Sequence, residues 1–191
     1  MESFDTSDLV SDIAPLIDVF RMLRERPRVY VIYLDKIGGL VTKGDLQKTP
    51  VRMWLFGLIS LLEMQLLRLI RGCHPGESWE EFLSQSRLDD AHKIFEERKA
   101  KNEEIDLADC LQFCDKRDIL KGSDEIRKLI GIESKKSVER LLRKAETLRN
   151  NLAHAQDIIT GHWPEIADLA QEMESLLEKM EKVVFSSEGA V

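Results

Sequence analysis

The segment SKKSVERLLRKAETLRNNLAH, residues 134–154, is the most informative part of this chain. On an α-helix, which turns about 100° per residue, its apolar side chains form a single stripe, as in helices that pack against a protein core. The stripe consists of Val138, Leu141, Leu142, Ala145, Leu148 and Leu152. We therefore predict a long helix that follows Ser134, runs to about Ile158 and turns this stripe inward.

Three polar residues lie away from the stripe. Asn150 and His154 are four residues apart and hence neighbours on one helix face, and Arg149 flanks that face. A histidine can exchange protons near neutral pH, and a guanidinium can bind a phosphate through two hydrogen bonds. Such a trio suits cleavage of RNA, whose own 2′-hydroxyl attacks the adjacent phosphorus, so that no metal is required. Spacing alone is also compatible with a second interpretation, in which the three residues belong to an ordinary solvent-exposed helix surface without catalytic function.

After Pro50, the helical spacing of the apolar residues predicts a bundle of four or five main helices. A strongly apolar helix is expected first, stopped by Gly72 and Pro75, and a proline opens the last helix. Besides the long helix, the expected helical segments are 51–71, 78–100 (one or two helices), 107–114, 123–130 and 164–184.

The first fifty residues have a different pattern. A helix is expected over 15–24, and a strand over 28–34, where β-branched and aromatic residues predominate. A turn over 35–38 and a short strand over 39–42 should follow, with a helix starting after Thr42. The predicted fold class is thus mainly α, with a small α/β unit over 1–50 and a helical domain over 51–191.

Composition and charge exclude several classes of protein. The chain has 191 residues, of which 43% are hydrophobic, enough to bury a core and exclude general disorder. The net charge of −7 argues against a positively charged coat for non-specific nucleic-acid binding. Between Ser134 and Arg149, however, the sequence contains six basic residues and only two acidic ones. This excess of positive charge could bind along the phosphate backbone of a nucleic acid, or it could belong to an ordinary solvent-exposed helix face.

We expect a cytoplasmic protein with no metal site. The longest apolar run, Trp54 to Ile70, is interrupted by polar residues, and the acidic N-terminus does not resemble a signal peptide. An odd number of cysteines indicates reduced thiols, with Cys110 and Cys114 as packing residues. The histidines lack the spacing of zinc ligands.

The segment Arg149-Asn150-x-x-x-His154, near the end of a long helix in a helical domain, resembles the HEPN superfamily. The signature of that superfamily is an arginine, a polar residue, a short spacer and a histidine. The resemblance covers residues 51 to 185 and implies a metal-independent endoribonuclease, often a toxin or defence effector, with a composite site across a homodimer. Arg149 would stabilise the phosphate, Asn150 would position it, and His154 would act as general base or acid.

The segment Ile37-Gly38-Gly39-Leu40-Val41-Thr42-Lys43-Gly44-Asp45-Leu46 is similar to the close of a CBS motif. By this resemblance, Thr42 and Asp45 are candidate contacts to the phosphate and ribose of an adenine nucleotide, which would be an effector and not a catalytic cofactor. The alternative is a capping pair at the start of a helix. CBS motifs work in pairs, and this chain has room for only one, so a second copy would have to supply the other.

Together the two resemblances imply a homodimeric ribonuclease that acts on RNA and not DNA, and whose N-terminal module senses a nucleotide or locks the dimer. An antitoxin or another regulatory partner is compatible with this interpretation. No membrane contact is expected, because no apolar run is long enough to span a bilayer. A second interpretation is a non-catalytic protein for nucleotide sensing or dimerisation. A third is a helical adaptor that binds another protein through the face of 51–71.

Overall fold

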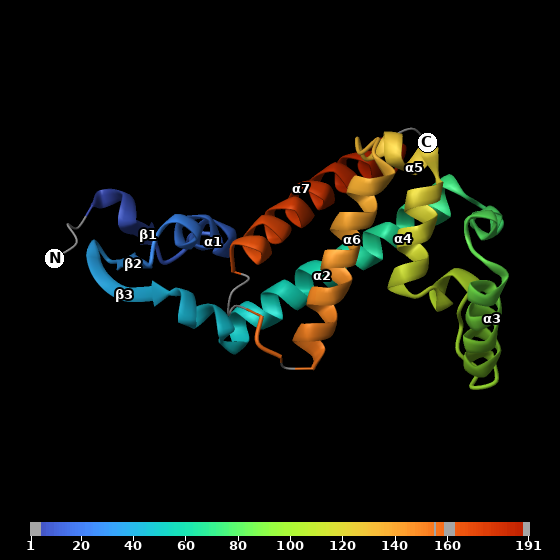
Figure 1. The fold of residues 1–191 in the computed structure, drawn as a ribbon, viewed down its shortest axis with the longest axis horizontal. Coiled ribbons are helices and arrows are strands. Elements are labelled where there is room, and N and C mark those ends of the chain that lie inside the picture. Colours follow the sequence, from blue (N-terminus) through green and yellow to red (C-terminus); the bar gives the residue numbers. More distant parts are fainter. Residues whose placement is uncertain (1–4, 155, 159–162, 189–191) are drawn as a thin grey trace. The chain divides into compact units, whose positions relative to one another are not determined.

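The protein is mainly helical, with seven α-helices and one small sheet among the residues that the computed structural model describes. These are residues 5–154, 156–158 and 163–188, with backbone only for 184–188. Figure 1 shows the helices and strands along the chain, which contacts between residues divide into two compact units. The first comprises the described residues of Met1–Leu58 and Leu148–Glu172, and the second those of Ile59–Thr147 and Met173–Val191. The fold class is thus confirmed at this level, and the proposed domain boundary at residue 50 stays a prediction.

A three-stranded sheet forms the N-terminal part of the first unit. Strand β1 (Leu9–Ser11) runs parallel to β2 (Arg28–Tyr33), and the helix α1 (Leu16–Glu25) connects them. Strand β3 (Lys36–Thr42) pairs antiparallel with β2. The predicted helix and strands are confirmed, whereas β1 was not predicted, because three residues are too short for an alternating pattern to show.

The turn between β2 and β3 differs from the prediction. It consists of Leu34 and Asp35, both with positive φ, and Tyr33 pairs directly with Lys36. Gly38, expected in the turn, lies within β3. A Cβ at Gly38 would come within 2.9 Å of the Cβ of Tyr33. The glycine therefore permits close packing of the hairpin and does not reverse the chain.

The core of the first unit is centred on an aromatic residue of α1. Phe20 is fully buried and makes edge-to-face contacts with Trp54 and Trp163, at ring-centroid distances of 4.9 and 4.5 Å. These rings come from α1, the start of α2 (Thr49–Cys73) and the start of α7 (Trp163–Glu188). An ion pair of 2.6 Å between Arg24 and Asp168 also joins α1 to α7.

The second unit contains α3 (Gln85–Lys99), α4 (Phe113–Gly122), α5 (Asp124–Leu129) and most of α6 (Lys135–Ala153). Short 3₁₀ turns at Ser78–Phe82 and Leu107–Cys110 precede α3 and α4. Ile59, Leu62, Leu66 and Ile70 of α2 are fully buried, with the three- and four-residue spacing of one helix face.

Several predicted helix boundaries need correction. Six α-helices lie between Thr49 and Glu188 within the described residues, and five of them are longer than the six residues of α5, in agreement with the four or five main helices expected. The difference is in the position of α4, which runs from Phe113 to Gly122. The predicted helix at 107–114 is instead a 3₁₀ turn followed by the first residues of α4. The helix expected after Thr42 begins as a 3₁₀ turn (Lys43–Gln47), and α2 starts at Thr49.

The apolar helix α2 has two kinds of surface. α2 is long and apolar enough to cross a membrane, but the core helices of soluble proteins can be equally long and apolar. In its most apolar stretch of 18 residues, 39% is buried within the protein. It also exposes Met53, Phe56, Leu61 and Met64. The cytoplasmic location and the absence of membrane contact stay predictions.

Candidate functional site

The helix that carries the motif is oriented as its sequence pattern predicts. Each member of the predicted apolar stripe is at most 9% exposed, whereas Asn150 and His154 are exposed and Arg149 is half-buried. The polar face of the motif is therefore turned away from the chain's own core. A histidine buried among aliphatic side chains would have excluded catalysis, and this is not what is observed.

The helix that carries the motif ends earlier than the sequence predicts. α6 ends at Ala153, not near Ile158, and His154 lies in the turn after it. The backbone N–H of His154 still donates to the carbonyl of Asn150 at 3.0 Å, so the two residues remain one helical turn apart. The N–H of Gln156 donates to the carbonyl of Asn151 at 2.9 Å, a bond spanning five residues that is typical of helix C-termini.

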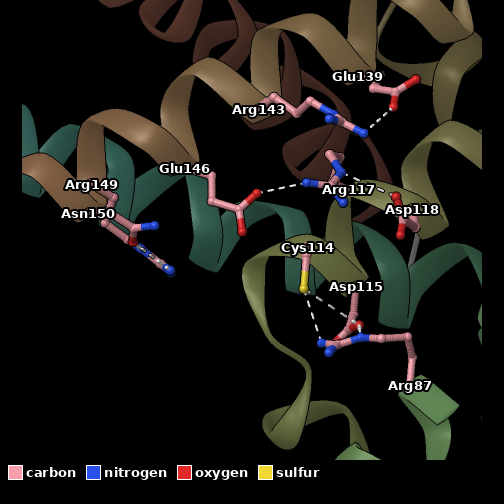
Figure 2. Close-up of polar contacts among 10 residues, drawn as sticks. All are labelled: Arg87, Cys114, Asp115, Arg117, Asp118, Glu139, Arg143, Glu146, Arg149 and Asn150. Carbon is pink, nitrogen blue, oxygen red and sulfur yellow. Dashed lines mark hydrogen bonds and ion pairs between the residues drawn. The ribbon is translucent and has the colours of Figure 1, made fainter.

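Arg149 and Asn150 contact each other directly. The Nε and Nη2 atoms of Arg149 donate to the side-chain oxygen of Asn150 at 3.4 and 3.3 Å (Figure 2). The guanidinium is thus held beside the amide on the surface of the helix. Because both contacts are long and exposed, they can exchange for contacts with a phosphate at little cost. The three candidate catalytic residues therefore lie within one turn and a half of chain.

Sequence reasoning missed the residue that holds the end of this helix. Arg52, near the start of α2, donates to the backbone carbonyls of Leu152 at 3.1 Å, Asn151 at 3.4 Å and Gln156 at 2.9 Å. A guanidinium can satisfy the carbonyls that a helix leaves open at its C-terminus. No local pattern signals this role, because Arg52 and Leu152 are 100 residues apart in the chain.

The two candidate nucleotide contacts bind each other. One carboxylate oxygen of Asp45 accepts from the backbone N–H of Thr42 at 2.7 Å and from its hydroxyl at 2.8 Å. The other oxygen pairs with Lys48 at 2.6 Å. These hydrogen bonds lower the pKa of Asp45 to about 2, with Lys48 the largest contributor. The pair thus stabilises the turn before α2, as in the capping alternative, and nucleotide binding here stays a prediction.

This capping role predicts a pH-dependent contribution to stability. The folded-state pKa of Asp45 lies below its ordinary value of 3.8, so its stabilisation is present above about pH 4 and disappears as the pH falls through 2. At pH 7, we expect Asp45→Asn to lower the free energy of unfolding by about 1 kcal/mol. Urea titrations from pH 7 to 2 should show the difference from wild type disappearing. Asp35→Asn, in the exposed hairpin turn, is the control, and an equal loss in it would contradict the assignment.

The second unit holds a network of buried charges around α4. Asp115 is 1% exposed and binds Arg87 through two hydrogen bonds of 2.6 and 2.9 Å. Arg117 pairs with Glu146 at 2.7 Å (Figure 2). These contacts connect α3 with α4 and α4 with α6, so their role is structural.

One of the three cysteines, Cys114, contacts this network. Arg87 also donates to the sulfur of Cys114 at 3.0 Å, and burial raises the pKa of the Cys110 and Cys114 thiols. Cys73, Cys110 and Cys114 are all free. Among the described residues, no group of three or more His, Cys, Asp or Glu side chains is arranged to hold a metal ion.

Comparisons with protein-family models, curated proteins and solved structures give no match to this chain. The similarity to the HEPN superfamily and to a CBS motif therefore stays a prediction from residues 37–46 and 149–154.

Proposed function

We propose that this protein is a HEPN-like, metal-independent endoribonuclease. The observation that carries the proposal is the polar trio at the end of α6, in which Asn150 and His154 are exposed and Arg149 is half-buried, while the apolar stripe of the same helix is buried. A helix that places Asn150 and His154 one turn apart on an exposed surface presents a proton acceptor beside an amide. Arg149 adds a permanent positive charge next to them.

Each residue of the trio has a role in the proposed reaction. His154 removes the proton of a ribose 2′-hydroxyl, and the oxygen forms a bond to the adjacent phosphorus. The bond from phosphorus to the 5′-oxygen of the next nucleotide breaks, and this oxygen takes up the proton from the protonated histidine, which leaves a 2′,3′-cyclic phosphate and a 5′-hydroxyl. Arg149 stabilises the negative charge that develops on the phosphorane, and Asn150 positions the phosphate.

The reaction is tested with the purified wild-type protein and a single-stranded RNA of mixed sequence. We expect cleavage in the presence of EDTA, because the RNA supplies its own nucleophile, and products that end in a 2′,3′-cyclic phosphate. A matched RNA with 2′-deoxyribose at the preferred cleavage position, and DNA of the same sequence, are the controls. Cleavage of either control at the same bond would exclude attack by the 2′-hydroxyl.

The protein is proposed to act as a homodimer whose CBS-like N-terminal units pair. The hairpin of β2 and β3 exposes Tyr33, Ile37 and Leu40, each more than half accessible. Exposed apolar side chains on a strand that forms the sheet edge favour association with another chain. This hairpin belongs to the same unit as Asn150 and His154.

We expect sedimentation equilibrium at micromolar concentration to give the mass of a dimer. Leu40→Lys should shift the protein towards monomer, because a charge on the hairpin would have to be buried between the copies. Ile13→Lys is the control, because Ile13 is 86% exposed and lies outside the hairpin. A wild-type monomer would remove the proposal of a composite site.

The second candidate function is a non-catalytic protein for dimerisation or nucleotide sensing. It is favoured by the same exposed hairpin, which can serve association without catalysis. Calorimetry with AMP and ATP, together with the RNA assay, separates the two. A protein that binds an adenine nucleotide and cleaves no RNA would support the second candidate.

A further inference from the structure

The segment around His154 depends on a contact from a distant part of the chain. α6 ends immediately before His154, so the helix itself no longer fixes the chain on both sides of this residue. The last carbonyls of a helix lack partners within the helix. The groups that bind these carbonyls therefore determine the path of the chain after α6.

Arg52 binds carbonyls on both sides of His154. Its Nη2 contacts the carbonyls of Asn151 and Leu152, which precede His154, and its Nη1 contacts the carbonyl of Gln156, which comes after it. The positive charge of the guanidinium also interacts favourably with the negative end of the helix dipole. A lysine has one ammonium group and cannot span the separated carbonyls in the same way.

Gln47 supports this arrangement. Its side-chain oxygen lies 3.5 Å from Nη1 of Arg52, and its amide nitrogen donates to the carboxylate of Asp157. Gln47 ends the 3₁₀ turn that contains Asp45. The turn before α2 and the chain after α6 are thus joined by side-chain contacts within the first unit.

We propose that Arg52 is a positioning residue, which places the His154 side chain by holding the carbonyls before and after it. This inference rests on the proposed ribonuclease function for its effect on catalysis, but the placement of the ring can be measured without activity. Arg52 acts through the backbone and touches neither the RNA nor the reacting atoms. Its loss should therefore affect kcat and leave KM for RNA unchanged.

The test compares Arg52→Met with Arg71→Met. Arg71 lies on the same helix and binds Asp106 and Asp109 at 2.7 and 2.8 Å, and all three residues belong to the second unit. We expect Arg52→Met to lower kcat by about 10- to 100-fold, as a small displacement of a catalytic group does. Arg71→Met should leave kcat unchanged, although both variants lose contacts that contribute to stability.

A second measurement separates this inference from the proposed function. The proton–carbon correlation of the His154 ring, identified by its loss in His154→Ala, should move or broaden in Arg52→Met and stay in place in Arg71→Met. An unmoved ring signal in Arg52→Met would overturn the inference, even if the wild type cleaves RNA. A wild type without cleavage would end the ribonuclease proposal, and the ring signal would still decide the role of Arg52.

If Arg52→Met fails to fold, Arg52→Lys replaces it in the same measurements. The lysine retains the charge and can satisfy one carbonyl, so we expect a smaller loss of kcat and a smaller displacement of the His154 signal. Identical kcat and an identical ring signal in Arg52→Lys and wild type would also overturn the inference.

Discussion

The variant His154→Ala is expected to cleave single-stranded RNA at least 100-fold more slowly than the wild type. General acid–base catalysis by a positioned side chain contributes about 10²- to 10⁴-fold, and alanine cannot exchange the proton of the 2′-hydroxyl. The fold should be unaffected, because His154 is exposed and its backbone N–H can still donate to Asn150. Initial rates on a labelled RNA, with circular dichroism of the same samples, measure both effects.

The matched control for this variant is His92→Ala. His92 is likewise exposed, and it lies on α3, outside the unit that contains the motif. Its replacement should leave the cleavage rate unchanged, which shows that exchanging an exposed histidine for alanine does not by itself abolish activity. Full activity in His154→Ala would refute the catalytic assignment of this residue.

The largest expected loss of stability is that of Asp115→Ala, about 3 kcal/mol in the free energy of unfolding. Removing one partner of a buried ion pair costs about 3–5 kcal/mol, and the partial exposure of Arg87 (28% of its side chain) places the expected value at the lower end. The variant also loses the bond of 2.8 Å from the backbone N–H of Gln112 at the start of α4. Urea denaturation followed by circular dichroism measures the difference.

The control is a second carboxylate on the same guanidinium. Asp90 lies 3.2 Å from Arg87, but 55% of its side chain is exposed, and exposed ion pairs contribute at most about 1 kcal/mol. Asp90→Ala should therefore have little effect. An equal decrease in the free energy of unfolding in the two variants would show that the burial of Asp115 is not the cause of its effect on stability.

Much of the fold could be predicted from the sequence because the relevant patterns are local. The strand at 28–33 and the burial of Val138, Leu142 and Leu148 follow from side chains a few positions apart. The strand β1 and the separate helix α4 could not be predicted in this way. β1 is only three residues long, and α4 contains Asp115 and Lys116, charged residues that are buried through partners on other helices.

The candidate site shows the same division. The exposure of Asn150 and His154 could be predicted, because the opposite face of α6 is apolar. The mutual binding of Thr42 and Asp45 was one of two alternatives, and the tertiary structure shows that both oxygens of the carboxylate already have partners. The direct contact of Arg149 with Asn150 required side-chain geometry that spacing does not contain.

The sequence by itself determined which face of α6 is polar, since helical periodicity depends only on residues within a few turns of one another. Only the tertiary structure decided where that helix ends. The end depends on which groups bind the last carbonyls, and here the guanidinium of Arg52 comes from the start of α2, 100 residues before Leu152. A pattern of neighbouring residues carries no information about so distant a donor, which becomes available only when the chain has folded.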